Sequence, residues 1–264
     1  MHYIICGIYH IIIEQTVRMM NEEEVDDLVS AIQHGDYTVI KDALRRRIAS
    51  ANARDSQGCS LLHWAAINNR YSIANLLIDH GADINVSGGV LEENPLQWAI
   101  RRKYYSMVDL LVRKGNNVLA HKSKSGDDAL ALAQKLGDYN MIILLLHWGS
   151  NPNAIVNADG DTHLLALLKT PKGASYENIE YIRLLLRFGA DPCVQDIHGN
   201  NAVHILAQCK GMINTYLVHD ICVAGGPGLT NAKNKAGQTA YKVRTLKLIY
   251  IYILLCLTNI IFVM

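Results

Sequence analysis

The chain has 264 residues, of which 50% are apolar and 19% charged, so it is long enough for one large domain or two small ones and is not intrinsically disordered. Its formal net charge of +1 lacks the basic footprint that sequence-independent nucleic-acid binding requires. The six cysteines include no C-x-x-C pair, which excludes a zinc ribbon and a dithiol redox motif and indicates a reducing compartment.

The first segment, residues 1–21, opens with thirteen residues that include no Asp, Glu, Lys or Arg. It resembles the apolar part of a signal peptide, but it has no positively charged start and no small-x-small cleavage site. We expect this segment to lie outside the folded repeats, with secretion of the chain as the alternative.

The middle of the chain repeats with a period near 34 residues. Similar segments begin at Ser60, Asn94, Asp128, Thr162, Asn201 and Thr239, with spacings of 34, 34, 34, 39 and 38 residues. A second marker is a glycine that recurs at Gly81, Gly115, Gly149 and Gly189, and it too gains its extra residues in the fourth unit. The agreement of two independent markers predicts tandem structural repeats.

Each repeat is predicted to form a pair of helices. A Ser, Asn or Thr at the start of a segment is a good N-cap for the first helix. The second helix has apolar residues at i, i+3, i+4 and i+7, and it ends in a glycine suited to a left-handed C-cap. Turn glycines follow at Gly58, Gly126, Gly160, Gly199 and Gly237. Since one helix pair cannot cover its own apolar face, we predict an all-α stack of about a dozen helices with almost no sheet.

The L-H-x-A pattern at this period resembles the ankyrin repeat. The His stands at His63 and His204, whereas Ala131 and Leu165 replace it in two repeats. The resemblance implies an all-α ankyrin-repeat solenoid over residues 22–242. The repeats are expected at about 22–57, 58–91, 92–125, 126–159, 160–198 and 199–236, with a partial one at 237–242.

Two consecutive repeats carry a more specific resemblance. The strings LLHWAAINNR, SGGVLEENPLQWAIRR and YYSMVDLLVRKGNN are similar to the ankyrin region of the Asp-His-His-Cys palmitoyltransferases, in the huntingtin-interacting subfamily. In that family the repeats precede transmembrane helices and a Cys-rich catalytic loop on a Golgi or vesicle membrane. The nearest string here, from His219 to Cys222, is not the catalytic motif and lacks its zinc ligands. The chain therefore resembles the substrate-recruiting part without the catalytic part.

The last segment, residues 243–264, includes seventeen uncharged residues from Leu248 to Met264. That length is the lower limit for a membrane span, and Lys242, Arg244 and Lys247 before it favour a cytoplasmic repeat region. A buried C-terminal helix and a gene-model artefact are the alternatives. With the resemblance, we expect the cytoplasmic face of a Golgi or vesicle membrane, or the cytoplasm if the tail does not insert.

No residue pattern points to catalysis or metal binding. The eleven histidines form no H-x-x-H or H-E-x-x-H face, and His63 and His204 are expected to hydrogen-bond the backbone of the adjoining loop. Cys59 precedes a capped helix with His63 four residues on, but no oxyanion site accompanies it. We predict no catalytic residue, no metal, no cofactor and no acyltransferase activity for the chain alone.

Two clusters of basic residues, 45–47 and 101–103, are expected at helix ends. Both are interpreted as solvated ends. The second cluster has two further interpretations, as the flank of a bound acidic peptide or as a contact with anionic lipid.

The candidate binding residues are Trp64, Trp98 and Asn68. The two tryptophans occupy the x of the L-H-x-A pattern, 34 residues apart, at a phase that lines the concave side of an ankyrin stack. We expect them side by side in one groove, and the alternative is that both pack between repeats. Asn68 lies one helical turn beyond Trp64.

The resemblance extends to these residues. In the resembling family, an Asn and a Trp at the positions of Asn68 and Trp98 clasp short segments made of a β-branched residue, two spacers and Gln-Pro, with the Trp on the Pro ring. The resemblance therefore implies a protein-interaction module that binds such linear motifs. The alternative is a fragment of an active palmitoyltransferase whose catalytic domain is missing from this chain.

Overall fold

The computed structural model describes residues 20–170, 176–209 and 214–243, and it divides into two compact units between Ser125 and Gly126. In these residues every regular element is a helix, apart from four isolated β-bridges. The predicted all-α architecture is therefore confirmed. The apolar segments expected at the two ends lie almost entirely outside the described residues. Among the residues described, no helix has both the length and the apolar character needed to cross a membrane.

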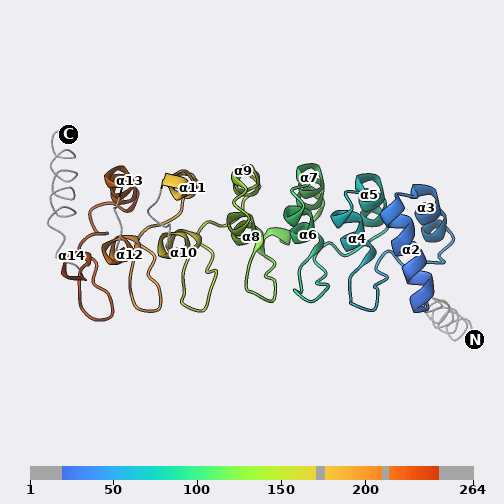
Figure 1. Cartoon of the computed structure of the whole chain (residues 1–264), viewed down its shortest axis with the longest axis horizontal. Coiled ribbons are helices and arrows are strands. Elements are labelled where there is room, and N and C mark those ends of the chain that lie inside the picture. Colours follow the sequence, from blue (N-terminus) through green and yellow to red (C-terminus); the bar gives the residue numbers. More distant parts are fainter. Residues whose placement is uncertain (1–19, 171–175, 210–213, 244–264) are drawn as a thin grey trace, which may run out of the picture. The chain divides into compact units, whose positions relative to one another are not determined.

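The first unit contains three helix pairs in its described residues (Figure 1). They are α2 (Glu22–His34) with α3 (Tyr37–Arg45), α4 (Leu61–Ile67) with α5 (Tyr71–Asp79), and α6 (Pro95–Arg101) with α7 (Tyr105–Lys114), followed by the 3-10 helix η1 (Val118–Ala120). The first helices of the pairs pack on one another in one layer, and the second helices do the same in another.

The second unit repeats this arrangement. Its helices are α8 (Ala129–Lys135), α9 (Tyr139–His147), α10 (His163–Lys169), α11 (Tyr176–Arg187), α12 (Ala202–Gln208), α13 (Thr215–Gly225) and α14 (Ala240–Val243). Here α10 packs on α12 and α12 on α14, while α11 packs on α13. The helix pairs therefore follow the predicted 34-residue period and its longer fourth and fifth steps.

Side-chain caps start the first helices where the sequence predicts them. The capping residues Ser60, Asn94, Asp128, Thr162 and Asn201 each accept a hydrogen bond from the backbone N–H of the third helical residue. At three of these caps, the side chain of the third helical residue (His63, Gln97 or His204) returns a bond to the backbone of the cap. Each such pair satisfies two backbone donors that the helix cannot, which fixes the start of a helix only seven residues long.

The glycine predictions hold with one exception. The turn glycines have φ between 71° and 82°, as the left-handed turn before each first helix requires, and Gly81, Gly149 and Gly189 are left-handed as well. The prediction for Gly115 is wrong, because its φ is −100° and its ψ is 131°. A Cβ at this glycine would lie 2.8 Å from the Leu111 carbonyl oxygen, so close packing rather than a left-handed turn requires glycine here.

The core of the first unit leaves one strip of α4 and α6 accessible. Five of the seven residues of each helix are buried, and in α4 only Trp64 and Ile67 are not. In α6 the corresponding pair is Trp98 and Arg101. Because the helices are so short, these few positions and the residues just beyond them are the only side chains that the two helices can offer to a partner.

Candidate functional site

Trp64 and Trp98 form the centre of the candidate site. Because α4 packs directly on α6, the two indole rings meet edge to face, with centroids 5.9 Å apart and planes at 86°. The His63 ring also meets Trp98 edge to face, at 5.0 Å. Such aromatic pairs contribute about 0.5–1.5 kcal/mol each beyond the area that they bury. Both tryptophans are half-buried, so they pack between repeats and still keep part of each ring accessible.

The loop before α4 fixes the orientation of Trp64. The indole N–H donates to Asp55 Oδ2 at 2.8 Å. The other oxygen of Asp55 accepts from the backbone N–H groups of Gln57 and Cys59, so the carboxylate is itself held in place. The polar edge of the Trp64 ring is therefore already satisfied, and what remains for a partner is apolar.

A double glycine brings the next loop against the same site. A Cβ at Gly88 would lie 2.9 Å from the Cys59 Cα, and one at Gly89 would lie 3.4 Å from Trp98 Cζ2. Gly89 also has a φ of 69°, which side chains rarely adopt. Both glycines are needed for the loop to lie this close to α4 and α6.

Asn68 is the residue that ends α4, one turn after Trp64. Its Nδ2 donates to the Trp64 carbonyl oxygen at 2.9 Å, and the side chain is half-buried. This bond uses one of the two amide hydrogens and fixes the direction of the group. The Oδ1 acceptor and the second hydrogen remain available to a bound segment.

His63 has a structural role. Its Nδ1 accepts from the Ser60 backbone N–H at 3.1 Å, so Nε2 carries the proton and donates to the Glu93 carbonyl oxygen at 2.9 Å. Burial is the main reason that the pKa of His63 falls to about 4. His204 likewise contacts the Gln238 carbonyl oxygen, at 3.0 Å, so the expected bonds from both histidines to adjoining loops are confirmed.

Cys59 does not have the setting of a nucleophile. Its side chain is 1% exposed, and burial, together with the charge of Asp55, raises the pKa of the thiol to about 11. A reactive cysteine needs the opposite shift. Within the described ranges, no group of His, Cys, Asp and Glu residues is arranged to hold a metal ion.

The burial of Cys59 predicts slow alkylation in the folded chain. Iodoacetamide at pH 8 is expected to modify Cys59 at least tenfold more slowly than Cys193, which is exposed and serves as the internal comparison. Peptide mapping by mass spectrometry measures both rates. Equal rates would mean that the loop around Cys59 opens far more readily than its packing indicates.

The structure also contains acid–base pairs that the sequence analysis missed. An acid directly before the helix cap pairs with a base eight residues later, at the end of the first helix. The pairs are Glu93 with Arg101, Asp127 with Lys135, and Asp161 with Lys169. The signal was present in the sequence, because these three pairs recur at the same 34-residue period.

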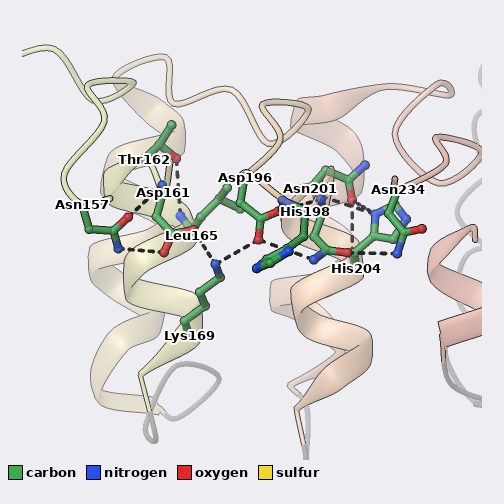
Figure 2. A network of polar contacts seen from close by, with 11 residues as sticks. Asn157, Asp161, Thr162, Leu165, Lys169, Asp196, His198, Asn201, His204 and Asn234 are labelled. Carbon is green, nitrogen blue, oxygen red and sulfur yellow. Dashed lines mark hydrogen bonds and ion pairs between the residues drawn. The ribbon is translucent and has the colours of Figure 1, made fainter. Parts of the chain in front are cut away.

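The third pair is part of a larger polar network in the second unit. Figure 2 shows Lys169 between Asp161 and Asp196, with Nζ 2.6 Å and 2.9 Å from their carboxylate oxygens. Burial acts to lower the pKa of Lys169, but its bonds to the two acids outweigh this and raise it. Burial likewise acts to raise the pKa of Asp196, whereas Lys169 and the amides of Asn200 and His198 lower it overall. The network holds the charges of Lys169, Asp161 and Asp196 in place and links two consecutive repeats.

A further surface lies at the start of the second helices of the first unit. Tyr37, Tyr71 and Tyr105 are each the first residue of their helix, and each is more than a third exposed. Tyr37 and Tyr71 line an open depression of about 660 Å³ together with Arg70. The Arg70 guanidinium donates to backbone carbonyls at the end of α2. Because Arg70 is engaged in this way, its charge gives no indication of which kind of partner the depression would bind.

Comparison with known proteins identifies the fold. Residues 62–112, which include Trp64 and Trp98, match the family model for ankyrin repeats (many copies). The chain has the ankyrin-repeat fold. The ankyrin repeat domain of Bcl-3 superimposes with a TM-score of 0.69 at 18% identity, over 86% of this chain and 96% of that one. An ankyrin repeat domain from Acinetobacter baumannii gives a TM-score of 0.62 at 26% identity, over 75% and 97%. Ankyrin stacks are protein-interaction modules with extended binding surfaces.

Curated relatives of the ankyrin region are palmitoyltransferases. The palmitoyltransferase akr1 of Emericella nidulans is 39% identical over 64 residues, which are 24% of this chain and 9% of that enzyme. The palmitoyltransferase AKR1 of Debaryomyces hansenii is 45% identical over 73 residues, or 26% and 9%. The similarity thus covers under a tenth of the length of either enzyme and is confined to its ankyrin region.

Proposed function

We propose that this ankyrin-repeat protein binds short extended segments of partner proteins on the face that carries Trp64, Trp98 and Asn68. The observation that carries the proposal is the half-buried, edge-to-face tryptophan pair, in which Asp55 holds the Trp64 ring. Large aromatic side chains that are already held in place lose little entropy on binding, which is why they dominate binding hot spots.

The segments proposed are of the type β-branched residue, two spacers, Gln-Pro. This choice rests on the resemblance of Asn68, Trp98 and their surroundings to the ankyrin region of the huntingtin-interacting palmitoyltransferases. A proline ring can lie against the accessible part of Trp98 without demanding a hydrogen bond, and a proline-containing segment loses little entropy when it docks. The Oδ1 of Asn68, with its remaining hydrogen, suits the backbone or the Gln amide of the segment.

The Trp98→Ala variant tests the proposal. Titration calorimetry with a Val-x-x-Gln-Pro peptide is expected to show a loss of at least about 2 kcal/mol, or about thirtyfold in Kd. The control is Trp148→Ala, which removes a half-buried tryptophan at the end of α9 in the second unit. Circular dichroism checks that both variants fold. Unchanged binding in Trp98→Ala, or its unfolding, would mean that Trp98 belongs to the core and that the proposed site is wrong.

The Asn68→Ala variant tests the polar part of the site. We expect it to weaken the same peptide by about 1–3 kcal/mol, because a polar group of the bound peptide is left without its partner. Asn140→Ala, which truncates an exposed Asn on α9, is the matched control and should bind like the wild type. Equal affinities for the two variants would remove Asn68 from the site.

A second candidate function is the recruitment of substrates to a palmitoyltransferase. The similarity to akr1 enzymes favours it. In this proposal the chain acts at the cytoplasmic face of a Golgi or vesicle membrane, together with a catalytic domain that contains the Asp-His-His-Cys motif. Sequencing of the transcript beyond codon 242 is the test. A continuation that encodes membrane spans and that motif would support the proposal, and a stop codon directly after codon 264 would count against it.

A further inference from the structure

Arg102 occupies the same place in its repeat as Asn68 does in the preceding one. Each residue ends a first helix, and each follows a tryptophan by four residues, so each lies one turn beyond that tryptophan on the same face. Since α4 packs directly on α6, Arg102 is next to Asn68 in the row of residues along the proposed binding face.

The charge of Arg102 is not compensated. The side chain is exposed, and it makes no hydrogen bond or ion pair within the part of the chain that the structure describes. The preceding residue is different, because Arg101 Nε lies 2.9 Å from the Glu93 carboxylate, which is almost fully buried. The basic cluster at the end of α6 therefore contains one arginine that is engaged within the protein and one that is directed to solvent.

The acids of this face are already engaged. Asp55 is held by Trp64 and by two backbone amides, and Glu93 is held by Arg101. Arg54, on the loop before α4, is a second exposed arginine without an ion pair in the described residues. The loop before α4 and the end of α6 therefore each carry an exposed guanidinium group without an ion pair in the described residues, which favours an acidic partner over a basic one.

We propose that this face selects extended segments with an Asp or Glu side chain close to the residue that contacts Trp98, and that Arg102 binds the carboxylate. This inference rests on the proposed peptide-binding function and adds a charge requirement to it. Guanidinium matches a carboxylate in a planar, two-bonded geometry, which lysine cannot reproduce. The partner is an acidic peptide segment rather than a membrane surface, because two half-buried tryptophans and an amide provide contacts for an extended chain beside the arginine.

The test compares acidic and neutral peptides with the whole chain. The peptides are Val-x-x-Gln-Pro segments with amidated C-termini that carry Glu two residues before or two residues after the motif, each matched by a Gln peptide. We expect one of the Glu peptides to bind about fivefold more tightly than its Gln match at 50 mM salt, the range of a partly exposed ion pair, and to lose most of that advantage at 500 mM. Arg102→Gln should remove the advantage, so that the Glu and Gln peptides bind this variant equally well. Arg45→Gln, which removes an exposed arginine at the end of α3, should preserve it.

The other outcomes contradict the inference, and each shows which of the two proposals fails. If Glu and Gln peptides bind the wild type equally well, or if the Glu advantage persists in Arg102→Gln, the charge requirement is wrong while the peptide-binding function stands. If neither peptide binds, both proposals fail. Vesicles of phosphatidylserine and of phosphatidylcholine are the last comparison. Loss of phosphatidylserine binding in Arg102→Gln, without any discrimination between peptides, would assign this arginine to a membrane contact instead.

Discussion

The Lys169→Met variant is expected to lower the free energy of unfolding by about 3 kcal/mol at pH 7. Lys169 is the cation between two carboxylates, Asp161 and Asp196, that are 2% and 1% exposed. Met keeps the length of the side chain and removes its charge, so two buried negative charges would face each other without a cation. Breaking a buried ion pair costs about 3–5 kcal/mol, and the lower end applies because the Lys169 side chain is itself 30% exposed.

The loss in free energy of unfolding caused by Lys169→Met should be smaller at acidic pH. Without the lysine, the two buried carboxylates repel each other, and binding a proton in acid relieves this repulsion in the variant. Urea unfolding at pH 7 and pH 5 measures both effects. Lys135→Met is the matched control, because Lys135 occupies the equivalent position in another repeat but pairs with a single carboxylate, that of Asp127, in the described residues. A loss in Lys169→Met no larger than that in Lys135→Met would show that the second carboxylate adds nothing.

The sequence predicts the parts of this fold that depend on local interactions. A cap such as Asn94 is recognisable because its partner, the backbone N–H of Gln97, is three residues away. The turn at Gly58 is recognisable because its conformation favours glycine whatever the surroundings. The period then places each such signal in every repeat, which is why the helix starts agree with the structure.

The features that the sequence analysis missed depend on residues distant in the chain. Gly115 follows the sequence pattern of its counterparts, yet its backbone is extended, and a Cβ there would lie 2.8 Å from the Leu111 carbonyl oxygen and 3.0 Å from Ile84 of the preceding repeat. Lys169 reaches Asp196, 27 residues further on, because α10 ends beside the loop that leads to α12. No local propensity encodes such contacts.

The candidate site combines both kinds of information. The 34-residue spacing places Trp64 and Trp98 in adjacent repeats, and the structure adds that their rings meet and that Asp55 orients one of them. The sequence alone did not separate Arg101 from Arg102. That distinction depends on which arginine can reach Glu93, eight residues before Arg101 and directly before the cap of α6.

Acidification is expected to destabilise the chain through His63, by about 3 kcal/mol between pH 7 and pH 4. The folded state holds His63 neutral, with a pKa of about 4, whereas the unfolded chain takes up a proton near pH 6.5. Above pH 6.5 both states are neutral and the contribution is fully present. As the pH falls from 6.5 to 4, the unfolded state binds the extra proton and is favoured, and below pH 4 the loss is complete.

His63→Gln separates this effect from the titration of the carboxylates. The next repeat provides the precedent, because Gln97 stands at the equivalent position and its Oε1 accepts the backbone N–H of the cap Asn94 at 3.1 Å. A Gln at position 63 can accept from Ser60 in the same way and cannot gain a charge. Between pH 7 and pH 4, the wild type should therefore lose about 3 kcal/mol more of its free energy of unfolding than the variant does. His34→Gln, which replaces an exposed histidine at the end of α2, controls for the loss of any imidazole. Urea unfolding at each pH measures both proteins. If the free energies of unfolding of the wild type and of His63→Gln fall in parallel with pH, the His63 ring gains its proton without opening the loop. The helix cap then does not depend on a neutral histidine.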